Sequence, residues 1–206
     1  MVRSAKNSFI RWFFHRYILR IVGRNFHAVN FNQIETNSDK SILLLANHYS
    51  WWDGFLLYYI NARLFKRKIH MMVHDQTLQQ HLYFKAIGAY PIKKKSKEIF
   101  KSLEYTTQLL ADPENLVVIF PQGKIYSNFI NSVNFEKGIG QVINKAAQSF
   151  QLIFAVSFIE HLQHKKASVN VYLKNIGTNC TNLTEVNQAF QEHYQAAKTE
   201  QTKTII

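Results

Sequence analysis

The feature that most constrains the fold is a regular alternation of short apolar runs with longer segments of helical periodicity. The apolar runs at residues 41–46, 69–73 and 116–120 are bounded by turn-forming or polar residues, which is typical of strands buried on both faces of a sheet. Strands that alternate with helices predict an α/β fold with a largely parallel sheet. We therefore expect a single α/β domain, in which a mostly parallel mixed sheet is flanked by helices.

The expected elements can be placed by their residue ranges. Strands are predicted at residues 41–46, 69–73, 89–93, 116–120, 152–158 and 168–174, and helices at residues 52–65, 76–86, 97–111, 136–150 and 183–198. The polar tail from residue 198 to residue 206 is expected to fray.

Composition narrows the class of protein and of partner. With 206 residues, of which 47% are hydrophobic and 18% charged, the chain is long and apolar enough for one globular domain with a sizeable core. Cys180 is the only cysteine, so no intrachain disulfide can form and a reducing compartment is expected. The formal net charge of +12 requires an anionic partner, such as nucleic acid, acidic lipid head groups or a phosphorylated substrate.

The N-terminus predicts an amphipathic helix. Ile10, Phe13, Phe14, Tyr17, Ile18 and Ile21 recur at helical spacing, while Arg11, His15, Arg16 and Arg20 lie outside this stripe. A basic, aromatic-rich helix of this kind is typical of a bilayer interface, although packing on the domain core gives the same pattern, and both can hold together. We therefore divide the chain into a membrane-contact segment at residues 1–30 and a catalytic domain at residues 31–206. No window of 18 uninterrupted apolar residues predicts a membrane span, and the arginines interrupt any secretory signal.

One segment carries the clearest chemistry. Asn47-His48-Tyr49-Ser50-Trp51-Trp52-Asp53-Gly54 directly follows the first buried run, so His48 leaves a strand and Asp53 lies about one helical turn further on. A carboxylate that binds one nitrogen of an imidazole fixes its tautomer and stabilises the charge that the ring acquires as a general base. His48 and Asp53 are therefore the candidate catalytic pair.

Two further motifs follow this segment along the chain, each at the end of a predicted strand. Gly88-Ala89-Tyr90-Pro91-Ile92 leads into Lys93 and Lys94, and a later buried run ends in Phe120-Pro121-Gln122-Gly123-Lys124. Together with the His-x4-Asp segment, these motifs resemble those of the glycerolipid acyltransferases, the family of 1-acylglycerol-3-phosphate and related lysophospholipid acyltransferases. The resemblance covers about residues 40–160.

The resemblance implies an activity and a set of substrates. A fatty acyl group would pass from a thioester donor, acyl-CoA or acyl carrier protein, to the hydroxyl of a lysophospholipid such as 1-acylglycerol-3-phosphate. The hydroxyl would attack directly with His48 as general base, no cofactor being needed. Ser50 lacks the Gly-x-Ser-x-Gly context of a nucleophile, so we reject a covalent intermediate. The expected location is peripheral, on the cytoplasmic face of a bacterial membrane.

Anion binding is expected from basic residues beside the motifs. Lys93 and Lys94 follow the second motif, where the family usually has an arginine, and Gln122, Gly123 and Lys124 form the third. We predict that these five residues bind substrate, although a solvated basic loop would look the same for the first two. The third motif departs from the family's Phe-Pro-Glu-Gly-Thr-Arg-Ser, because Gln122 replaces the glutamate and Ile125 the arginine. This favours, as an alternative, a non-phosphatidic acceptor such as an aminolipid, an isoprenoid or a sugar lipid.

Three other classes of function are weaker. His70, His74 and Asp75 are spaced like metal ligands, but side chains four apart on a strand lie about 13 Å apart, so we expect no metal. Nucleic-acid binding is suggested by charge alone, without a recognition motif, and we expect none. The replacement of the family glutamate by Gln122 leaves open the interpretation that the chain is a non-catalytic, lipid-binding relative. The intact His48 and Asp53 argue against that interpretation.

Overall fold

The computed structural model confirms the predicted α/β architecture. It describes residues 8–93, 98–146, 149–177 and 182–205. The helices of this part are α1 (Ser8–Asn25), α2 (Asp53–Ile60), the π-helix η1 (Asn61–Phe65), α3 (Asp75–Gln80), the 3-10 helix η2 (Leu82–Ile87), α4 (Glu98–Leu109), α5 (Ile139–Lys145) and α6 (Leu183–Thr202). The strands are β1 (Ala28–Phe31), β2 (Ser41–Ala46), β3 (Lys68–His74), β4 (Ala89–Ile92), β5 (Asn115–Ile119), β6 (Phe150–Glu160) and β7 (Ser168–Gly177).

The seven strands form one mixed sheet in the order β1-β7-β6-β2-β5-β3-β4. Only the β6–β7 hairpin is antiparallel, and every other neighbouring pair in the sheet is parallel. β2 lies in the middle, between β5 and β6, and all six of its residues are buried. Because β2 and β5 are parallel neighbours, the segments that follow them leave the same edge of the sheet side by side.

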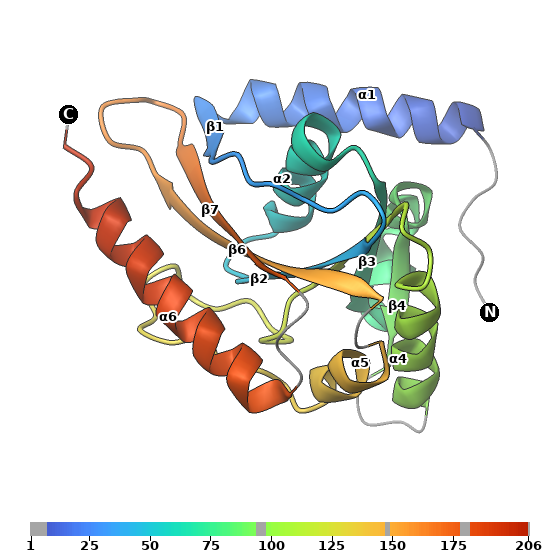
Figure 1. Ribbon diagram of the computed structural model, residues 1–206. Helices are drawn as coiled ribbons and strands as arrows, with labels where there is room; N and C mark the ends of the chain where they lie inside the picture. Colours follow the sequence, from blue (N-terminus) through green and yellow to red (C-terminus); the bar gives the residue numbers. More distant parts are fainter. Residues whose placement is uncertain (1–7, 94–97, 147–148, 178–181, 206) are drawn as a thin grey trace.

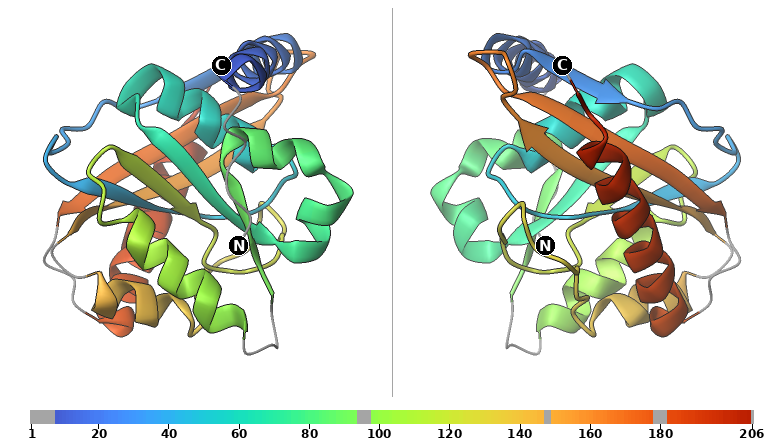
Figure 2. Two further views of the ribbon diagram at one scale, coloured as in Figure 1. Left: turned by 90° about the vertical axis from the view of Figure 1, so that its right-hand side faces the viewer. Right: turned by 90° about the vertical axis from the view of Figure 1, so that its left-hand side faces the viewer.

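Helices cover both faces of the sheet, so the molecule has three layers and two apolar cores (Figures 1 and 2). Alternate residues of β2 divide between the cores, as strand geometry requires. Ile42 and Leu44 pack on the side of α1 and α2, and Leu43 and Leu45 pack on the side of α4, α5 and α6.

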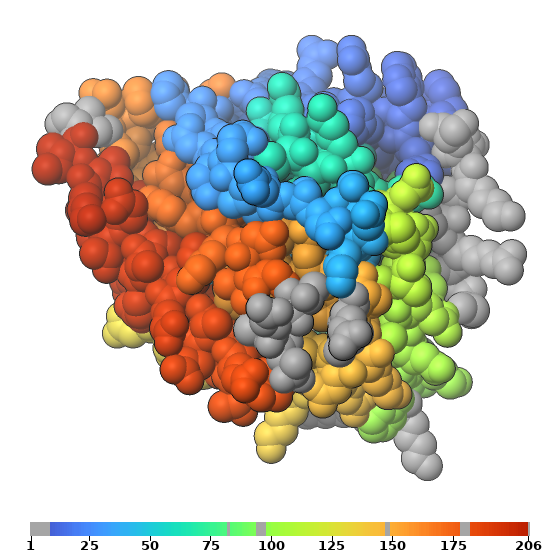
Figure 3. Space-filling model, in the orientation of Figure 1, coloured from blue at the N-terminus to red at the C-terminus, as the bar shows by residue number. Residues whose placement is uncertain are grey.

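Helix α1 is both a core element and an exposed surface. Ile18 and Val22 are fully buried in the same core as β2, and Phe14 packs against it. The rest of the predicted stripe is divided, since Ile10, Phe13 and Tyr17 are exposed. Figure 3 shows α1 (dark blue) along the upper edge of the molecule, near α2 (teal). No helix in the described ranges is long and apolar enough to cross a membrane.

Some element boundaries differ from the sequence-based expectation. The short strand β1 was not predicted, and the segment expected as one helix at residues 76–86 is broken at His81 into α3 and η2. The helix expected at residues 136–150 is only the two turns of α5, because residues 150–160 form β6. The tail does not fray before residue 202, since α6 continues to Thr202 and buries Gln201.

Candidate functional site

The predicted catalytic residues meet where β2 and β5 end. His48 follows β2, and Phe120 follows β5, in the adjacent parallel strand. Their rings stack at a centroid distance of 4.2 Å with an interplanar angle of 19°. The first and third motifs, about 70 residues apart in the sequence, therefore form one site at the carboxyl edge of the sheet.

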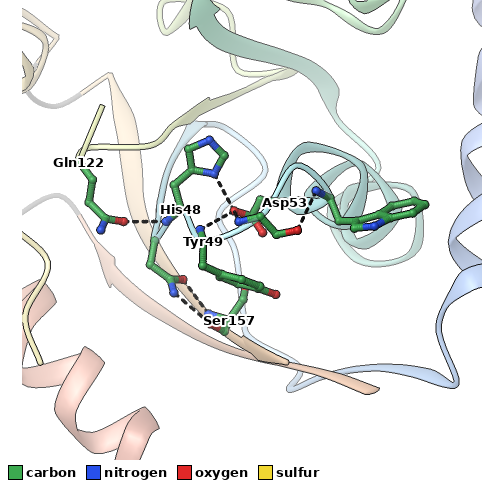
Figure 4. Close-up of polar contacts among 8 residues, drawn as sticks. His48, Tyr49, Asp53, Gln122 and Ser157 are labelled. Carbon is green, nitrogen blue, oxygen red and sulfur yellow. Dashed lines mark hydrogen bonds and ion pairs between the residues drawn. The ribbon is translucent and has the colours of Figure 1, made fainter. Parts of the chain in front are cut away.

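His48 and Asp53 form the pair that the sequence predicts. Nδ1 of His48 lies 2.6 Å from Oδ2 of Asp53, and the same oxygen accepts the backbone N–H groups of Tyr49 (2.8 Å) and Ser50 (2.9 Å), as Figure 4 shows in part. These three contacts fold residues 48–53 into a tight turn at the start of α2. Ser50 uses its hydroxyl oxygen to accept the backbone N–H of Trp52 at 3.1 Å, a local contact within the same turn.

Burial sets the electrostatics of this pair. Asp53 is only 4% exposed, and this desolvation raises the pKa of its carboxyl group, while the hydrogen bonds from His48, Ser50 and Tyr49 act in the opposite direction. The carboxylate binds the Nδ1–H of His48, so the neutral imidazole keeps its lone pair on Nε2. His48 also lines a cavity, and this arrangement therefore offers a base to a bound hydroxyl group.

The third motif holds the backbone of His48 from two sides. The N–H of His48 donates to Oε1 of Gln122 at 2.6 Å (Figure 4), and the carbonyl oxygen of His48 accepts the N–H of Tyr126 at 2.9 Å. Gln122 is buried, and we had predicted it to bind substrate. The sequence could not reveal its contact with His48, because that contact depends on the pairing of β5 with β2.

Asn47 fixes the other side of the catalytic turn. Its buried side chain exchanges two hydrogen bonds with the backbone of Ser157 in β6, donating to the carbonyl oxygen at 3.0 Å and accepting the N–H at 2.8 Å (Figure 4). The amide thus continues the β2–β6 pairing past the end of β2. Sequence reasoning quoted Asn47 within the motif without giving it a role, although an asparagine next to a strand end is the available signal.

A cavity of about 650 Å³ opens beside His48, and its size falls in the range of small-molecule sites. Its wall is mostly apolar and comes from both sides of the sheet edge, including Phe55, Met71, Phe84, Ile92, Leu103 and Ile119. Polar or charged groups are fewer, among them His74, Lys124 and Glu136. An elongated apolar group with one polar end near His48 fits this lining.

The predicted anion-binding residues are not equivalent. Lys124 is exposed at the cavity, and Gly123 also lines it, although the N–H of Gly123 donates to the carbonyl oxygen of Phe120 in a turn. Lys93 forms an ion pair of 2.8 Å with Glu98, which raises the pKa of the lysine and lowers that of the glutamate. Lys94 lies outside the described residues.

Metal ligands do not gather in the described ranges, where no group of three or more His, Cys, Asp and Glu side chains could hold an ion. His70 and His74 lie at different positions along β3, and Nε2 of His70 contacts Oδ1 of Asn115 at 3.2 Å. This contact satisfies His70 within the fold.

Comparison with known proteins places the chain in context. The family model described as Acyltransferase matches residues 25–169, which is more than two thirds of the chain and includes all three motifs. Among solved structures, the crystal structure of the 1-acyl-sn-glycerophosphate (LPA) acyltransferase PlsC from Thermotoga maritima matches with a TM-score of 0.65 and 14% sequence identity. The match covers 95% of this chain and 83% of that one, and it shows a shared fold. A comparison with curated proteins found no match.

Proposed function

Because the chain belongs to the Acyltransferase family, we propose that it transfers a fatty acyl group from a thioester donor to the hydroxyl group of a lysophospholipid, with His48 as general base. The contact that carries this proposal is the 2.6 Å hydrogen bond between His48 and the buried Asp53, at the mouth of an apolar cavity. The donor is acyl-CoA or acyl carrier protein, and the acceptor is of the 1-acylglycerol-3-phosphate type.

The reaction proceeds by direct attack. Nε2 of His48 takes the proton of the acceptor hydroxyl as its oxygen bonds to the thioester carbonyl carbon, and Asp53 stabilises the imidazolium that forms. The tetrahedral intermediate then expels the thiolate, which receives the proton from His48. One C–O bond has formed and one C–S bond has broken, so the products are an ester and a free thiol, and no cofactor is needed.

The cavity and its rim would bind different parts of the substrates. The apolar wall suits a fatty acyl chain, whose burial contributes about 0.8 kcal/mol per methylene group. Lys124 at the rim would attract the acceptor phosphate as a point charge. Since Gln122 is occupied by the backbone of His48, its difference from the family glutamate does not by itself argue for a non-phosphatidic acceptor.

Acyl transfer from labelled acyl-CoA and acyl carrier protein to a panel of lysolipids tests this proposal. We expect wild type to form product and His48→Ala to lose at least a thousandfold in kcat. Asp53→Asn, which keeps the shape but removes the charge that stabilises the imidazolium, should lose a comparable factor. Both variants must keep the wild-type circular dichroism spectrum. Near wild-type turnover in either one would contradict the assigned mechanism.

The same proposal includes a location at a membrane surface. Helix α1 presents Phe9, Trp12, Phe13 and Tyr17 to solvent, next to Arg16 and Arg20. Exposed aromatic residues interleaved with arginines suit the interface of an anionic bilayer, where lysolipid acceptors reside. We therefore propose peripheral attachment to the cytoplasmic face of the membrane through α1.

A further inference from the structure

A second cavity, of about 340 Å³, lies at the opposite end of β3 from the active site. Among the residues that line this basic pocket are Arg11, His15, Tyr58, Asn61, Lys66 and His70. Lys68, one of its lining residues, is paired in register with Asn115 at the start of β5, whereas His48 stacks on Phe120 just after the end of β5. The length of β5 therefore separates the two sites by roughly 15 Å.

Unpaired positive charge distinguishes this pocket. Its described lining includes four Lys or Arg side chains and two histidines, but no aspartate or glutamate. Lys68 forms an ion pair with Glu114, and the guanidinium group of Arg67 donates to backbone carbonyl oxygens, including that of Pro113. Within the described residues, the side chains of Arg11 and Lys66 make no hydrogen bond or ion pair, so two full charges remain available to a ligand.

The position of Lys66 is fixed by the backbone. Lys66 follows the π-helix η1 and has a φ angle of 55°, in the left-handed region that costs a side-chain-bearing residue free energy. The buried Asn61 holds this turn, because its side chain exchanges hydrogen bonds with the backbone of Arg67, and its carbonyl oxygen accepts the N–H of Lys66 at 2.7 Å. Single π-turns are frequent at functional sites.

Two imidazole rings complete the lining. Nδ1 of His15 lies 3.3 Å from the hydroxyl group of Tyr58, and His70 is held by Asn115. Burial lowers the pKa of His70, and the charge of Arg11 lowers it further. The cationic groups of the pocket therefore act on one another, and a bound anion would relieve that repulsion.

We propose that the basic pocket binds a phosphate monoester group, held chiefly by Arg11 and Lys66, at a site separate from the catalytic centre. A monoester carries a charge of about −1.5 to −2 at neutral pH, which matches these two cations, and its three free oxygens suit a site with several donors. The group can belong to a lipid headgroup or to a soluble phosphate compound. This assignment does not depend on acyl transfer.

The first arm of the test uses soluble phosphate. Binding of inorganic phosphate to the full chain is measured by isothermal titration calorimetry for wild type, for Arg11→Gln with Lys66→Gln, and for Lys101→Gln with Lys145→Gln. The last pair makes the same change in net charge on exposed positions of α4 and α5, across the sheet from the basic pocket. A Lys124→Gln variant removes the exposed cation at the active site.

The second arm uses vesicles of phosphatidylcholine that contain either phosphatidate, a monoester, or phosphatidylglycerol, a diester, at equal total negative charge. Cosedimentation with the same four proteins is measured. A lipid headgroup source predicts that wild type prefers phosphatidate vesicles, and that this preference is lost in Arg11→Gln with Lys66→Gln, kept in the control pair and at most partly reduced in Lys124→Gln.

Binding that falls at least tenfold in Arg11→Gln with Lys66→Gln, while the control pair binds like wild type and Lys124→Gln loses clearly less than the first pair, supports the site. If this pattern is found with inorganic phosphate, soluble phosphate is a sufficient ligand. If it is found only with phosphatidate vesicles, the ligand is the lipid headgroup. The proposal is overturned if wild type binds neither probe, if both double variants weaken equally, or if only Lys124→Gln weakens binding. Thermal unfolding confirms that each variant is folded.

Discussion

At the scale of single residues, His48, the proposed general base, is positioned by one nearby residue and by contacts that come from far along the chain. Its ring is fixed by Asp53 and by Phe120, and its backbone by Gln122 and Tyr126. A displacement of about 1 Å at a general base can lower a rate about a hundredfold. The residues that position His48 are therefore expected to contribute to turnover as well as the ring that would accept the proton.

Gln122 separates a positioning role from substrate binding. In Gln122→Leu the partly buried N–H of His48 loses its acceptor, so we expect kcat to fall about 10- to 100-fold with little change in KM. In Gln122→Glu a carboxylate oxygen can accept the same N–H, and kcat should stay within several-fold of wild type. Steady-state kinetics of both variants measure this. A rise in KM at unchanged kcat would instead show that Gln122 contacts the substrate.

The sequence predicted the contact between His48 and Asp53, but not the contacts that hold the backbone of His48. His48 and Asp53 are five residues apart, so their contact follows from a single turn, and the motif alone was enough to predict the pair. The contact between Gln122 and His48 spans 74 residues and depends on which strand lies next to β2. Periodicity and spacing do not specify strand order, so the contact of Gln122 with His48 could not be predicted, and its predicted binding of substrate stays a prediction.

At the scale of elements, helix α1 has one side packed in the core and another side that we propose contacts the membrane. One side contributes Ile18 and Val22 to the core, while Phe9 and Trp12 are 67% and 58% exposed. The two faces explain why a stripe that looked continuous in the sequence is divided in the structure. Removing the helix would take residues out of the core as well as off the surface, so a truncation cannot test membrane attachment.

Point substitutions on the outer face of α1 test that attachment without touching the core. Trp12→Ser combined with Phe13→Ser should lower the affinity for anionic vesicles about tenfold or more, because the apolar anchor is lost, and should leave the melting temperature nearly unchanged. Phe100→Ser, an equally exposed aromatic position on α4, is the control. Vesicle cosedimentation measures both, and equal losses in the two proteins would exclude α1 as the contact surface.

Other elements show where local pattern fails. β1 has only four residues, Ala28–Phe31, none of them fully buried, so it lacks the apolar run by which β2 and β5 were found. It exists because β7 offers it a parallel partner. The helix expected at residues 136–150 ends at Lys145, and Phe150, the last residue of the expected range, instead begins β6 and pairs with Ser41. In both places tertiary pairing overrides local preference.

At the scale of the whole molecule, the packing of α6 on the sheet makes stability depend on pH. His193 lies on α6, and its Nε2 contacts the carbonyl oxygen of Tyr172 in β7 at 2.9 Å. Burial lowers the pKa of His193 below its ordinary value of 6.5. The unfolded chain therefore binds a proton more readily than the folded chain, and the same direction holds for His70.

We expect the free energy of unfolding to be highest above about pH 7 and to decrease as the pH falls below 6.5, because protons then favour the unfolded state. Urea unfolding at pH 7.5 and pH 5.5 measures the decrease. It should be smaller in His193→Gln, which removes the titrating group and can still donate to Tyr172. His161→Gln, at an exposed position after β6, should leave the decrease as in wild type.

The place of β5 in the sheet has a consequence for the newly made chain. β2 and β3 follow one another in the sequence, yet β5 lies between them, and the segment just after β5 supplies the ring and the amide that hold His48. A nascent chain that stops before residue 120 lacks both of these partners, however well its first strands have formed. The proposed activity would therefore arise late in synthesis, through contacts of high sequence separation that are slow to form, and a partly translated chain would stay inert.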